Sequence, residues 1–471
     1  MEQLPESLIY FTKRLTNYSV NTVKLQSLNT QKLASNGATQ LRVALPVNSI
    51  VNMKSFSMVG TVRTYGVAEQ GGNSNTIYAL IPRGGIQGLM DRISWSCGGI
   101  QLDNGTSAIN LVQNTKNWIE KTNDKTLSDG GVLEQSYFEP IDPADAWAGT
   151  NQGQEKTLVA NNFLGFTECE PTYLDSSRVP EMFATFQLAN KGVLSVQAEN
   201  SPLGQSFWVS NPNFTGTECE FEIDDIHFTI EVCSVGSGLY DAVVGEILAS
   251  RGVLEVPYKT YQSFSTDVSS AGSSIRSSVS TMSLDKIYAF NRNNGVQYAT
   301  LGDNTTVYPS AGATQFAQYN PWNIQQAPIE CEGNVGVGFE SAYFNKISQG
   351  ISEWNFRVNN APLPLFNVSP VEAYNFVVCG NDRSYSKIEG SMVGSQDTWL
   401  DNAFVAMVRL NQGNDPRLIS GMDLSALNAQ IAFNSTSNNA DGSGVPRQLW
   451  LVTESTSVLR IGDMRAISVV N

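Results

Sequence analysis

The sequence has almost no histidine. His227 is the single imidazole in 471 residues, and it falls at an outward position of an alternating strand pattern. Ser-His-Asp or Cys-His catalysis would have to depend on this one group, and metal sites built from several histidines are excluded. The glycine patterns of dinucleotide-binding and phosphate-binding loops are also missing. We therefore expect no enzymatic activity, no cofactor and no bound metal.

Charged residues are scarce as well. They make up 15% of the chain, against about a quarter in ordinary globular proteins, and uncharged polar residues and glycine take their place. Uncharged polar groups cost less to desolvate than ions, so this composition suits faces that neighbouring molecules cover. The net charge of −15 repels phosphate, and we expect no sequence-specific nucleic-acid partner.

Long apolar runs and cysteine pairs are missing too. No stretch approaches the roughly 20 apolar residues of a membrane span, and residues 1–20 lack the apolar core of a signal peptide. The sequence thus predicts a product made in the cytoplasm or nucleus and not secreted. Its six cysteines form no C-x-x-C pair, so we expect reduced, buried thiols: Cys97, Cys169, Cys219, Cys233, Cys331 and Cys379.

Strand patterns dominate what is present. Runs of four to ten residues rich in Val, Ile, Phe, Tyr and Thr alternate with clusters of Gly, Asn, Asp, Ser and Pro. The clearest run is 218–233, in which apolar and polar residues alternate strictly except at Asp224-Asp225. Alternation indicates one buried face, and the shift by one residue predicts a β-bulge or a break.

Helical patterns are few and short. Residues 107–121 predict one helix, and residues 239–250 predict a second that ends at Gly252, a suitable C-cap. The sequence Ser369-Pro370-Val371-Glu372 predicts a third helix that starts with a capping box.

Two parts of the sequence echo each other. In each, a strand containing a tryptophan (Trp95, Trp354) leads through a turn and a short strand into a helix. The strand 41–47, with Pro46, also resembles 254–258, with Pro257. These echoes predict a structural repeat and the following division: an arm at 1–37, a first domain at 38–238, a linker helix at 239–252, and a second domain at 253–471 with a loop insertion at 291–338.

The predicted arm carries a mild positive charge and an apolar stripe. An amphipathic helix would place its apolar residues on one side, so we expect contact with a membrane or a neighbouring molecule. The residues assigned to this contact are Leu8, Ile9, Phe11, Lys13, Arg14 and Leu15.

The order of these features resembles the double jelly-roll major capsid proteins of tailless icosahedral DNA viruses, the hexon-like lineage. The resemblance rests on the two echoing halves, the helix leading into residues 252–259, the segment 354–365, and the turn 418–423. It implies an all-β fold of two tandem eight-stranded jelly rolls, with a few short helices and long surface loops. It assigns structural roles to Trp95, Gly252, Pro257, Trp354 and Pro370.

The resemblance also implies a function and a set of partners. It predicts a structural subunit that forms homotrimers, which tile an icosahedral shell as pseudo-hexagonal capsomers. Neighbouring capsomers, penton and minor capsid proteins, and an internal membrane reached by the arm are the expected partners. The expected location is the virion, after synthesis in the host cytoplasm or nucleus.

Two other readings stay open at this point. A non-capsid β-sandwich that binds carbohydrate or acts as a viral attachment protein would need an exposed aromatic side chain in a shallow groove. A carbohydrate-active enzyme would need two carboxylates that flank a sugar, and Asp224/Asp225 and Glu168/Glu170 are such pairs in sequence.

Overall fold

The structure is a computed structural model, and strands make up most of what it describes. The described residues are 18–65, 77–81, 85–103, 106–120, 155–161, 163–190, 193–198, 220–235, 237–268, 272–293, 337–339, 346–347, 351–380, 404–412, 419–425, 429–437 and 447–471. The predicted all-β class is confirmed.

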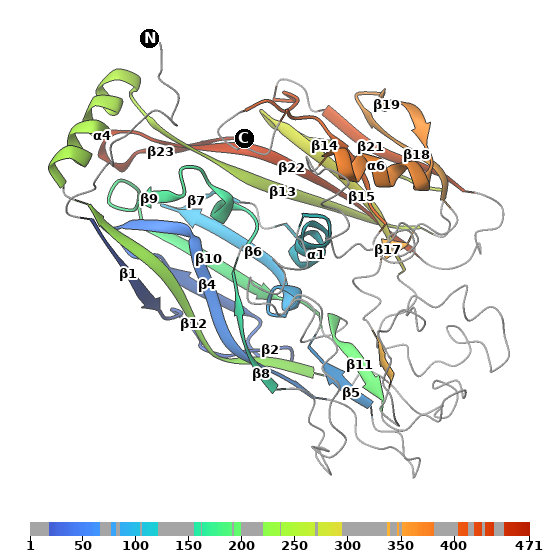
Figure 1. The fold of residues 1–471 in the computed structure, drawn as a ribbon, viewed down its shortest axis with the longest axis horizontal. Coiled ribbons are helices and arrows are strands. Elements are labelled where there is room, and N and C mark those ends of the chain that lie inside the picture. The colour runs from blue at the N-terminus through green and yellow to red at the C-terminus, as the bar shows by residue number, and fades with distance from the viewer. Residues whose placement is uncertain are drawn as a thin grey trace, which may run out of the picture.

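The first half of the chain forms a sandwich of two antiparallel sheets, at the lower left of Figure 1. Sheet 1A has the order β1-β12-β4-β8, in which β2 also pairs with β12 and β9 with β4. Sheet 1B has the order β3-β10-β6-β7. The bounds for sheet 1A are β1 (Tyr18–Leu25), β2 (Leu33–Ala34), β4 (Ile50–Tyr65), β8 (Glu155–Ala160), β9 (Tyr173–Asp175) and β12 (Glu220–Val235); those for sheet 1B are β3 (Gln40–Ala44), β6 (Met90–Cys97), β7 (Ile100–Gln101) and β10 (Met182–Leu188).

The second half repeats this arrangement. Sheet 2A has the order β13-β22-β15-β17, in which β20 also pairs with β15 and β23 with β22, and sheet 2B has the order β14-β21-β18-β19. The bounds for sheet 2A are β13 (Leu254–Val268), β15 (Leu284–Asn293), β17 (Lys346–Ile347), β20 (Ala406–Arg409), β22 (Arg447–Ile461) and β23 (Ile467–Val470); those for sheet 2B are β14 (Ser274–Val279), β18 (Ile351–Val358), β19 (Ala361–Val368) and β21 (Ala429–Ser437).

The first predicted echo matches this repeat. Strands β6 and β7 lead into helix α1 (Ile109–Glu120), and β18 and β19 lead into helix α6 (Pro370–Gly380) at the same place in the second sandwich. The capping box of α6 is also present, because Ser369 N donates to Glu372 Oε2 at 2.9 Å and Glu372 N donates to Ser369 Oγ at 3.3 Å.

The second predicted echo was wrong. By position in the sheets, β3 is equivalent to β14, whereas the strand at 254–258 belongs to β13, which is equivalent to β1. Strand β1 falls inside the segment 1–37 that was expected to be an arm, and it pairs with β12 from Tyr18↔Val235 to Leu25↔Phe228. Strand β1 therefore covers residues 228–235 of the β12 edge, next to β2, which covers residues 222–223.

Strand β12 shows how the sequence pattern sets the register. Phe221 and Ile223 are buried before the shift, and Ile226 and Phe228 are buried after it. The pairing with β4 slips between Asp224 and His227, and Asp225 has a φ of 51°. The predicted bulge is confirmed, and it keeps the apolar side chains on the core face on both sides of the slip.

Aromatic side chains fill both cores. In the first sandwich, Phe56 of sheet 1A contacts Trp95 of sheet 1B edge-on, with ring centroids 5.3 Å apart. In the second, Trp354 packs edge-on against Phe356 at 5.5 Å, and both side chains are buried. Such contacts add specific geometry to the apolar burial that stabilises a sandwich.

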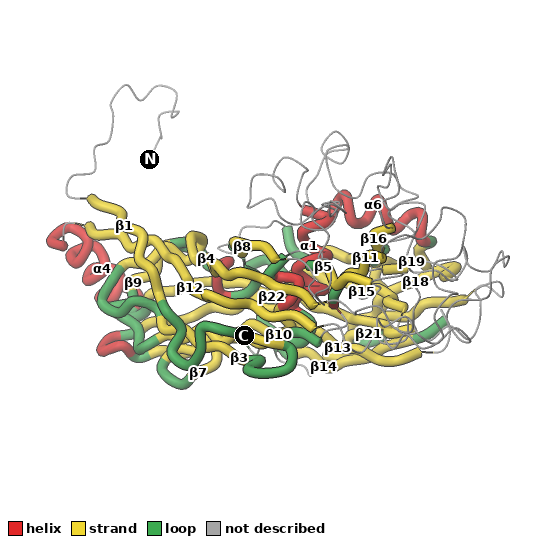
Figure 2. The backbone as a smooth tube through the Cα atoms, turned by 90° about the horizontal axis from the view of Figure 1, so that it is seen from below, coloured by secondary structure: helices red, strands yellow, loops and turns green. Residues whose placement is uncertain are grey.

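Two further elements connect the halves. Helix α4 (Ser237–Arg251) joins β12 to β13 at one end of the elongated molecule, opposite α6 in both Figure 1 and Figure 2. At another place, β11 (Ser195–Ala198) pairs on one side with β5 (Ile77–Leu80) and on the other with β16 (Val337–Phe339), so strands from both halves share one small sheet. The rest of the predicted insertion from 294 to 336 lies outside the described residues.

Candidate functional site

A buried polar cluster lies between the two sandwiches. The outer face of sheet 2A carries charged and hydroxyl side chains, and α1 together with the short 3₁₀ helix η4 (Phe166–Glu168) of the first half contributes further groups to the same cluster. We call this cluster the junction. Its members are Lys116, Glu168, Tyr261, Lys286, Tyr288 and Glu454.

Lys116 of α1 is the central cation of the junction. Its Nζ lies 3.2 Å from Glu168 Oε1 of its own half and 3.6 Å from Glu454 Oε2 of β22. It also donates to the Tyr261 hydroxyl, which in turn donates to Glu168 Oε2 at 2.7 Å. One ammonium group thus bonds to both halves of the chain.

Glu454 is the buried anion that faces this cation. Burial opposes ionisation of its carboxyl, but the charges of Lys116, Lys286 and Lys259 and the hydrogen bond from Tyr288 outweigh that effect and lower its pKa to about 2. Burial also raises the pKa of the Tyr261 hydroxyl well above its ordinary value, with the charge of Glu168 acting in the same direction. At neutral pH the junction holds an ionised glutamate and a neutral tyrosine.

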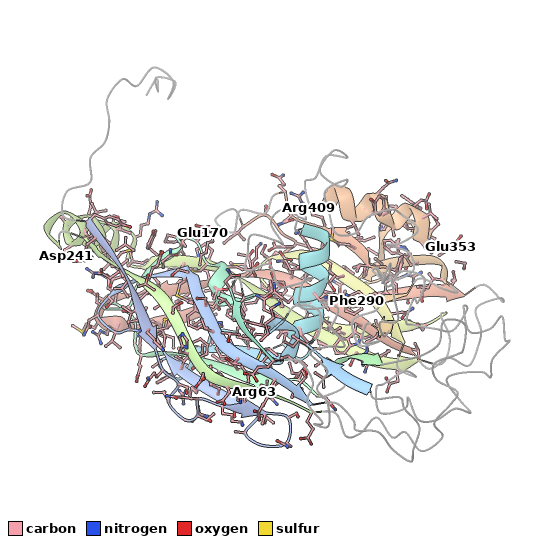
Figure 3. The ribbon with its side chains drawn as sticks, turned by 60° about the horizontal axis from the view of Figure 1, so that its bottom comes forward. Arg63, Glu170, Asp241, Phe290, Glu353 and Arg409 are labelled. Atoms are coloured by element: carbon pink, nitrogen blue, oxygen red, sulfur yellow. The ribbon has the colours of Figure 1, made fainter. Side chains whose placement is uncertain are left out.

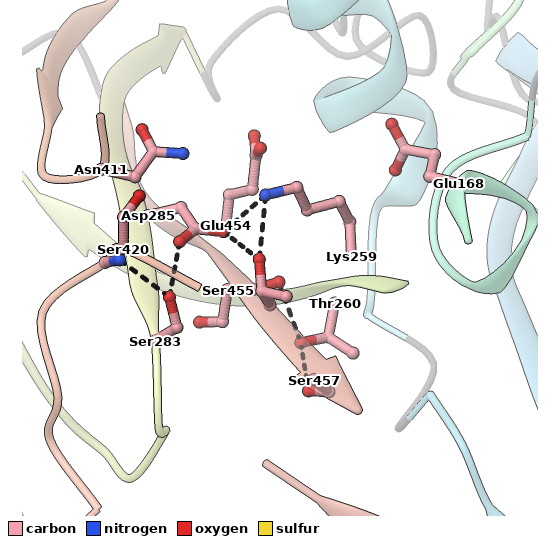
Figure 4. Close-up of polar contacts among 12 residues, drawn as sticks. Glu168, Lys259, Thr260, Ser283, Asp285, Asn411, Ser420, Glu454, Ser455 and Ser457 are labelled. Carbon is pink, nitrogen blue, oxygen red and sulfur yellow. Dashed lines mark hydrogen bonds and ion pairs between the residues drawn. The ribbon is translucent and has the colours of Figure 1, made fainter. Parts of the chain in front are cut away.

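A second charged group in sheet 2A adjoins the junction (Figure 4). Lys259 Nζ lies 2.6 Å from Asp285 Oδ2 and 2.9 Å from Thr456 Oγ1. Ser283 Oγ donates to the other Asp285 oxygen at 2.8 Å and accepts from Gly421 N at 3.0 Å. A Cβ atom added at Gly421 would lie 2.5 Å from both Asp285 Oδ1 and the Leu284 carbonyl oxygen, so glycine is needed at this turn.

Hydrogen bonds and an aromatic contact along β13 also join the two sandwiches. Tyr258 Oη donates to the Leu102 carbonyl oxygen at 2.7 Å, and its ring meets Phe166 edge-on at 5.0 Å. The backbone N–H of Glu170 donates to the Pro257 carbonyl oxygen at 2.9 Å. The two sandwiches are therefore held together by ionic, aromatic and backbone contacts at once.

Three of the four carboxylates in the acidic pairs considered from sequence form ion pairs. Glu168 pairs with Lys116, Glu170 Oε1 lies 2.5 Å from Lys54 Nζ, and Asp224 Oδ2 lies 3.3 Å from Arg63. These contacts give each of the three carboxylates a place in the ion-pair network of the fold. Within the described ranges, no three His, Cys, Asp or Glu side chains are grouped to hold a metal ion.

An exposed apolar surface lies at the far edge of the second sandwich. Leu365 is 87% exposed and Phe366 is 56% exposed on the edge strand β19, and Val371 is 53% exposed on the adjacent α6. We call these three residues the edge patch. Exposed apolar side chains at a sheet edge are candidates for an interaction surface.

Two polar networks on sheets 2B and 1A differ in composition. On sheet 2B, Asn434 donates to Asn355 at 3.2 Å, Asn355 to Asn367 at 2.6 Å, and Asn367 to Glu353 at 3.0 Å. On sheet 1A, Arg63 instead joins Glu155, Glu222 and Asp224 in ion pairs. Figure 3 shows Arg63 and Glu353 on different halves, so the amide-rich face belongs to the half with the edge patch.

Of the five residues assigned structural roles from sequence, two lie in the cores and three lie at helix ends or in a strand. Trp95 and Trp354 are buried in the two cores, with exposed fractions of 0% and 1%. Gly252 follows α4 with a φ of 77° and donates to Leu248 O, Pro257 lies in β13, and Pro370 is the first residue of α6. The arm residues Leu8, Ile9, Phe11, Lys13, Arg14 and Leu15 lie outside the described residues.

Sequence reasoning missed the junction. Lys286 and the adjoining Lys259 lie in the predicted strand runs 278–290 and 253–264, and Glu454 directly follows the predicted run 448–453. The remaining signal was the placement of charged residues in or beside three strand runs of the second half, where burial of a charge requires a partner.

The structure bears on the predicted state of the cysteines and on the predicted lack of a membrane span. Among the described cysteines, Cys97, Cys169 and Cys233 are free and buried, and burial raises the pKa of the Cys97 and Cys169 thiols to about 12. Of the helices that the structure describes, none has the length and apolar character to cross a membrane.

Comparison with known proteins bears on the fold. No protein-family model and no curated protein sequence matches the chain. Among solved structures, a chain of the PBCV-1 virus capsid superposes with a TM-score of 0.56 at 11% identity, covering 99% of each chain. The fold is a double jelly roll. This similarity agrees with the sheet orders described above, which occur once in each sandwich.

Two other solved structures agree over nearly the whole chain. A chain of the Sputnik virophage has a TM-score of 0.55 at 11% identity and covers 100% of this chain and 92% of its own. The Faustovirus major capsid protein has a TM-score of 0.55 at 10% identity, covering 97% of this chain and 92% of its own. The predicted double jelly-roll fold is confirmed.

Proposed function

We propose that this protein is a major capsid protein, a structural subunit and not an enzyme. The observation that carries the proposal is the combination of two jelly rolls fixed to each other by a buried junction with an exposed edge patch on the outer side of the pair. The structural neighbours include PBCV-1 VP54 and the Faustovirus major capsid protein, which supports this reading. A shell subunit must present a fixed shape to its neighbours, and the junction provides it.

The proposed unit of assembly is a homotrimer. A cyclic trimer repeats one heterologous contact until the ring closes, so each copy needs two different surfaces. The edge patch offers an apolar surface for one side of that contact. Six jelly rolls, two from each copy, would then form a pseudo-hexagonal capsomer.

The division of the chain follows the same proposal. We assign residues 18–235 to the first jelly roll, α4 to the linker, and residues 254–470 to the second. This division differs from the sequence prediction by including β1 and β2 in the first jelly roll and by starting the linker at residue 237. Neighbouring capsomers, penton and minor capsid proteins are the proposed partners, and the virion is the proposed location.

The native mass of the purified protein tests the trimer. Light scattering should give three times the chain mass of 51.2 kDa, about 154 kDa, and negative-stain images of the same sample should show hexagonal blocks. A stable monomer that binds glycans on an array would overturn the proposal in favour of a carbohydrate-binding or attachment protein.

Substitution of the edge patch tests the contact itself. The double variant Leu365→Asp/Phe366→Asp should stay folded by circular dichroism and run as a monomer, because charges would be desolvated in the contact. Leu28→Asp is the matched control, since Leu28 is an exposed leucine of the first half with 59% exposure. It should leave the trimer intact, and a trimer that survives both changes would place the contact elsewhere.

A further inference from the structure

Two arginines on the outer face of sheet 2B have no partner. Arg276 of β14 and Arg357 of β18 are exposed, and neither forms a hydrogen bond or an ion pair within the described part of the chain. Most other described arginines do have a partner, as Arg63, Arg178 and Arg460 show by their ion pairs. Acidic residues outnumber basic ones 44 to 29 in this chain. A face that leaves two guanidinium groups unpaired in so acidic a protein is a candidate site for an anion from outside.

The register of sheet 2B places the two arginines on either side of one alanine. Arg276 pairs with Ala432 of β21, and Arg357 pairs with the same Ala432 from the other side. The three strands lie side by side in the sheet (Figure 1). Neighbouring strands are about 4.8 Å apart, so the backbones of the two arginines are about 10 Å from each other. Both side chains are therefore placed to reach the space above a single small residue.

The two arginines and the alanine all face away from the core. The residue before each arginine is buried, so strand alternation turns Arg276 and Arg357 outward. Ala432 lies between the core residues Ile431 and Phe433, so it also faces outward, yet its exposed fraction is only 7%. Longer side chains must cover it, and the arginines are its direct partners in both adjacent strands. The apolar stems of the arginines therefore converge over this alanine.

The surroundings of this pair are rich in neutral hydrogen-bonding groups. The adjoining rows of the same face carry amides and hydroxyls: Ser274, Asn434 and Asn355 in one row, and Ser278 and Gln430 in the other. Glu353, four residues before Arg357, accepts a hydrogen bond from Asn367 at 3.0 Å. A ligand bound here would meet two positive charges at its centre and uncharged donors and acceptors around them.

This chemistry favours an acidic sugar over other anions. A carboxylate accepts two parallel hydrogen bonds from one guanidinium group, and amide and hydroxyl side chains suit the hydroxyl groups of a sugar ring. The net charge of −15 disfavours a nucleic acid, whose phosphates are closely spaced. A protein contact needs an apolar centre, and the three rows contain no outward apolar side chain except the covered Ala432.

We propose that the outer face of sheet 2B binds a carboxylate-bearing sugar between Arg276 and Arg357. The two guanidinium groups hold the carboxylate, and the neighbouring amides and serines hold hydroxyl groups of the sugar. The site adds an attachment role to the proposed shell subunit. It does not depend on that function, since the binding residues all belong to one chain.

Calorimetric titration of the purified full-length protein tests the site. Sialyllactose and oligogalacturonate are the acidic probes, and lactose is the neutral control because it lacks the carboxylate. At least one acidic probe should bind, and lactose should not. Arg276→Gln and Arg357→Gln should each weaken the binding about tenfold, and the double variant about a hundredfold. Glutamine keeps an apolar stem over Ala432, so the circular dichroism spectrum should stay unchanged.

A matched arginine and the native mass complete the test. Arg251 at the end of α4 is exposed and has no partner among the described residues, so Arg251→Gln should bind the acidic probe as the unchanged protein does. Failure of both acidic probes to bind, or equal binding by the double variant, would overturn the proposal. A double variant with a smaller native mass in light scattering would assign this face to a contact between copies, which also overturns it.

Discussion

The cores of the jelly rolls and the junction between them bury side chains in opposite ways. In the cores, aromatic rings such as Phe56 and Trp95 meet without any charge, whereas the junction buries Lys116 and Glu454 against each other. The free energy gained by apolar burial is proportional to the buried area and depends little on the direction of the contact. A buried ion, in contrast, needs an oppositely charged group at one particular position. The difference teaches that the cores stabilise each half, while the junction fixes how the halves are placed.

The largest effects should come from the cores. Trp95→Ala and Trp354→Ala each remove a fully buried ring, and each should lower the free energy of unfolding by about 3–5 kcal/mol. Urea denaturation followed by far-ultraviolet circular dichroism measures this loss. The exposed control Leu28→Ala should change it by less than about 0.5 kcal/mol. Equal midpoints for all three variants would contradict the core assignment.

Removing the junction anion should have the next largest effect. Glu454→Gln leaves three lysines near one neutral amide and should cost about 3 kcal/mol, because uncompensated buried charge is expensive. The control Glu255→Gln breaks an exposed pair with Arg460 and should cost less than about 1 kcal/mol. If both variants unfold at the same urea concentration, the junction contributes no more than a surface ion pair.

Acid should weaken the junction before it weakens the cores. The pKa of Glu454 is about 2 in the folded protein and 4.5 for an ordinary glutamate. A lowered folded pKa means that its contribution is complete above pH 4.5 and disappears as the pH falls toward 2, a loss of about 3 kcal/mol. Unfolding free energies measured from pH 5 to 2 should fall less steeply in Glu454→Gln, and parallel curves would refute the assignment.

Alanine substitution at two glycines should have smaller effects on stability, and the two effects should be opposite in sign because neighbouring atoms crowd only one of the two positions. Gly421→Ala forces a methyl group against Asp285 and the Leu284 backbone and should cost about 1–3 kcal/mol. Gly245→Ala lies in α4 with nothing within 4 Å, and it should raise helix stability by about 0.5–1 kcal/mol. Thermal unfolding of the two variants should therefore shift in opposite directions, and a shift in the same direction would contradict this account of the turn.

Much of the fold was predictable because local patterns specify it. The alternation in β12, the bulge at Asp224-Asp225 and the capping box at Ser369 each depend on residues close in sequence. Strand β1 was missed because its eight residues are mostly exposed, so its sequence YSVNTVKL carries no strong apolar alternation. It is a strand because β12 offers a free edge more than 190 residues later.

The junction could not be predicted for a related reason. Lys116 and Glu454 lie far apart in sequence, and neither shows from its neighbours that it will be buried. A charged residue in a strand run normally faces water, and only the packing of α1 on sheet 2A reverses that expectation here. The contact depends on tertiary structure, which periodicity alone does not encode.

The pairing of β13 with β22 has a consequence for the making of the protein on the ribosome. Every residue of β13 from Leu254 to Val268 finds its partner between Arg447 and Ile461. At about 5–20 residues per second, synthesis of the chain between them takes roughly 10 to 40 seconds. During that time the first jelly roll already has all its strands, while β13 waits as an unpaired edge. The second jelly roll closes only after residues 447–461 have been made, which makes the earlier nascent chain the stage most exposed to aggregation and to chaperones.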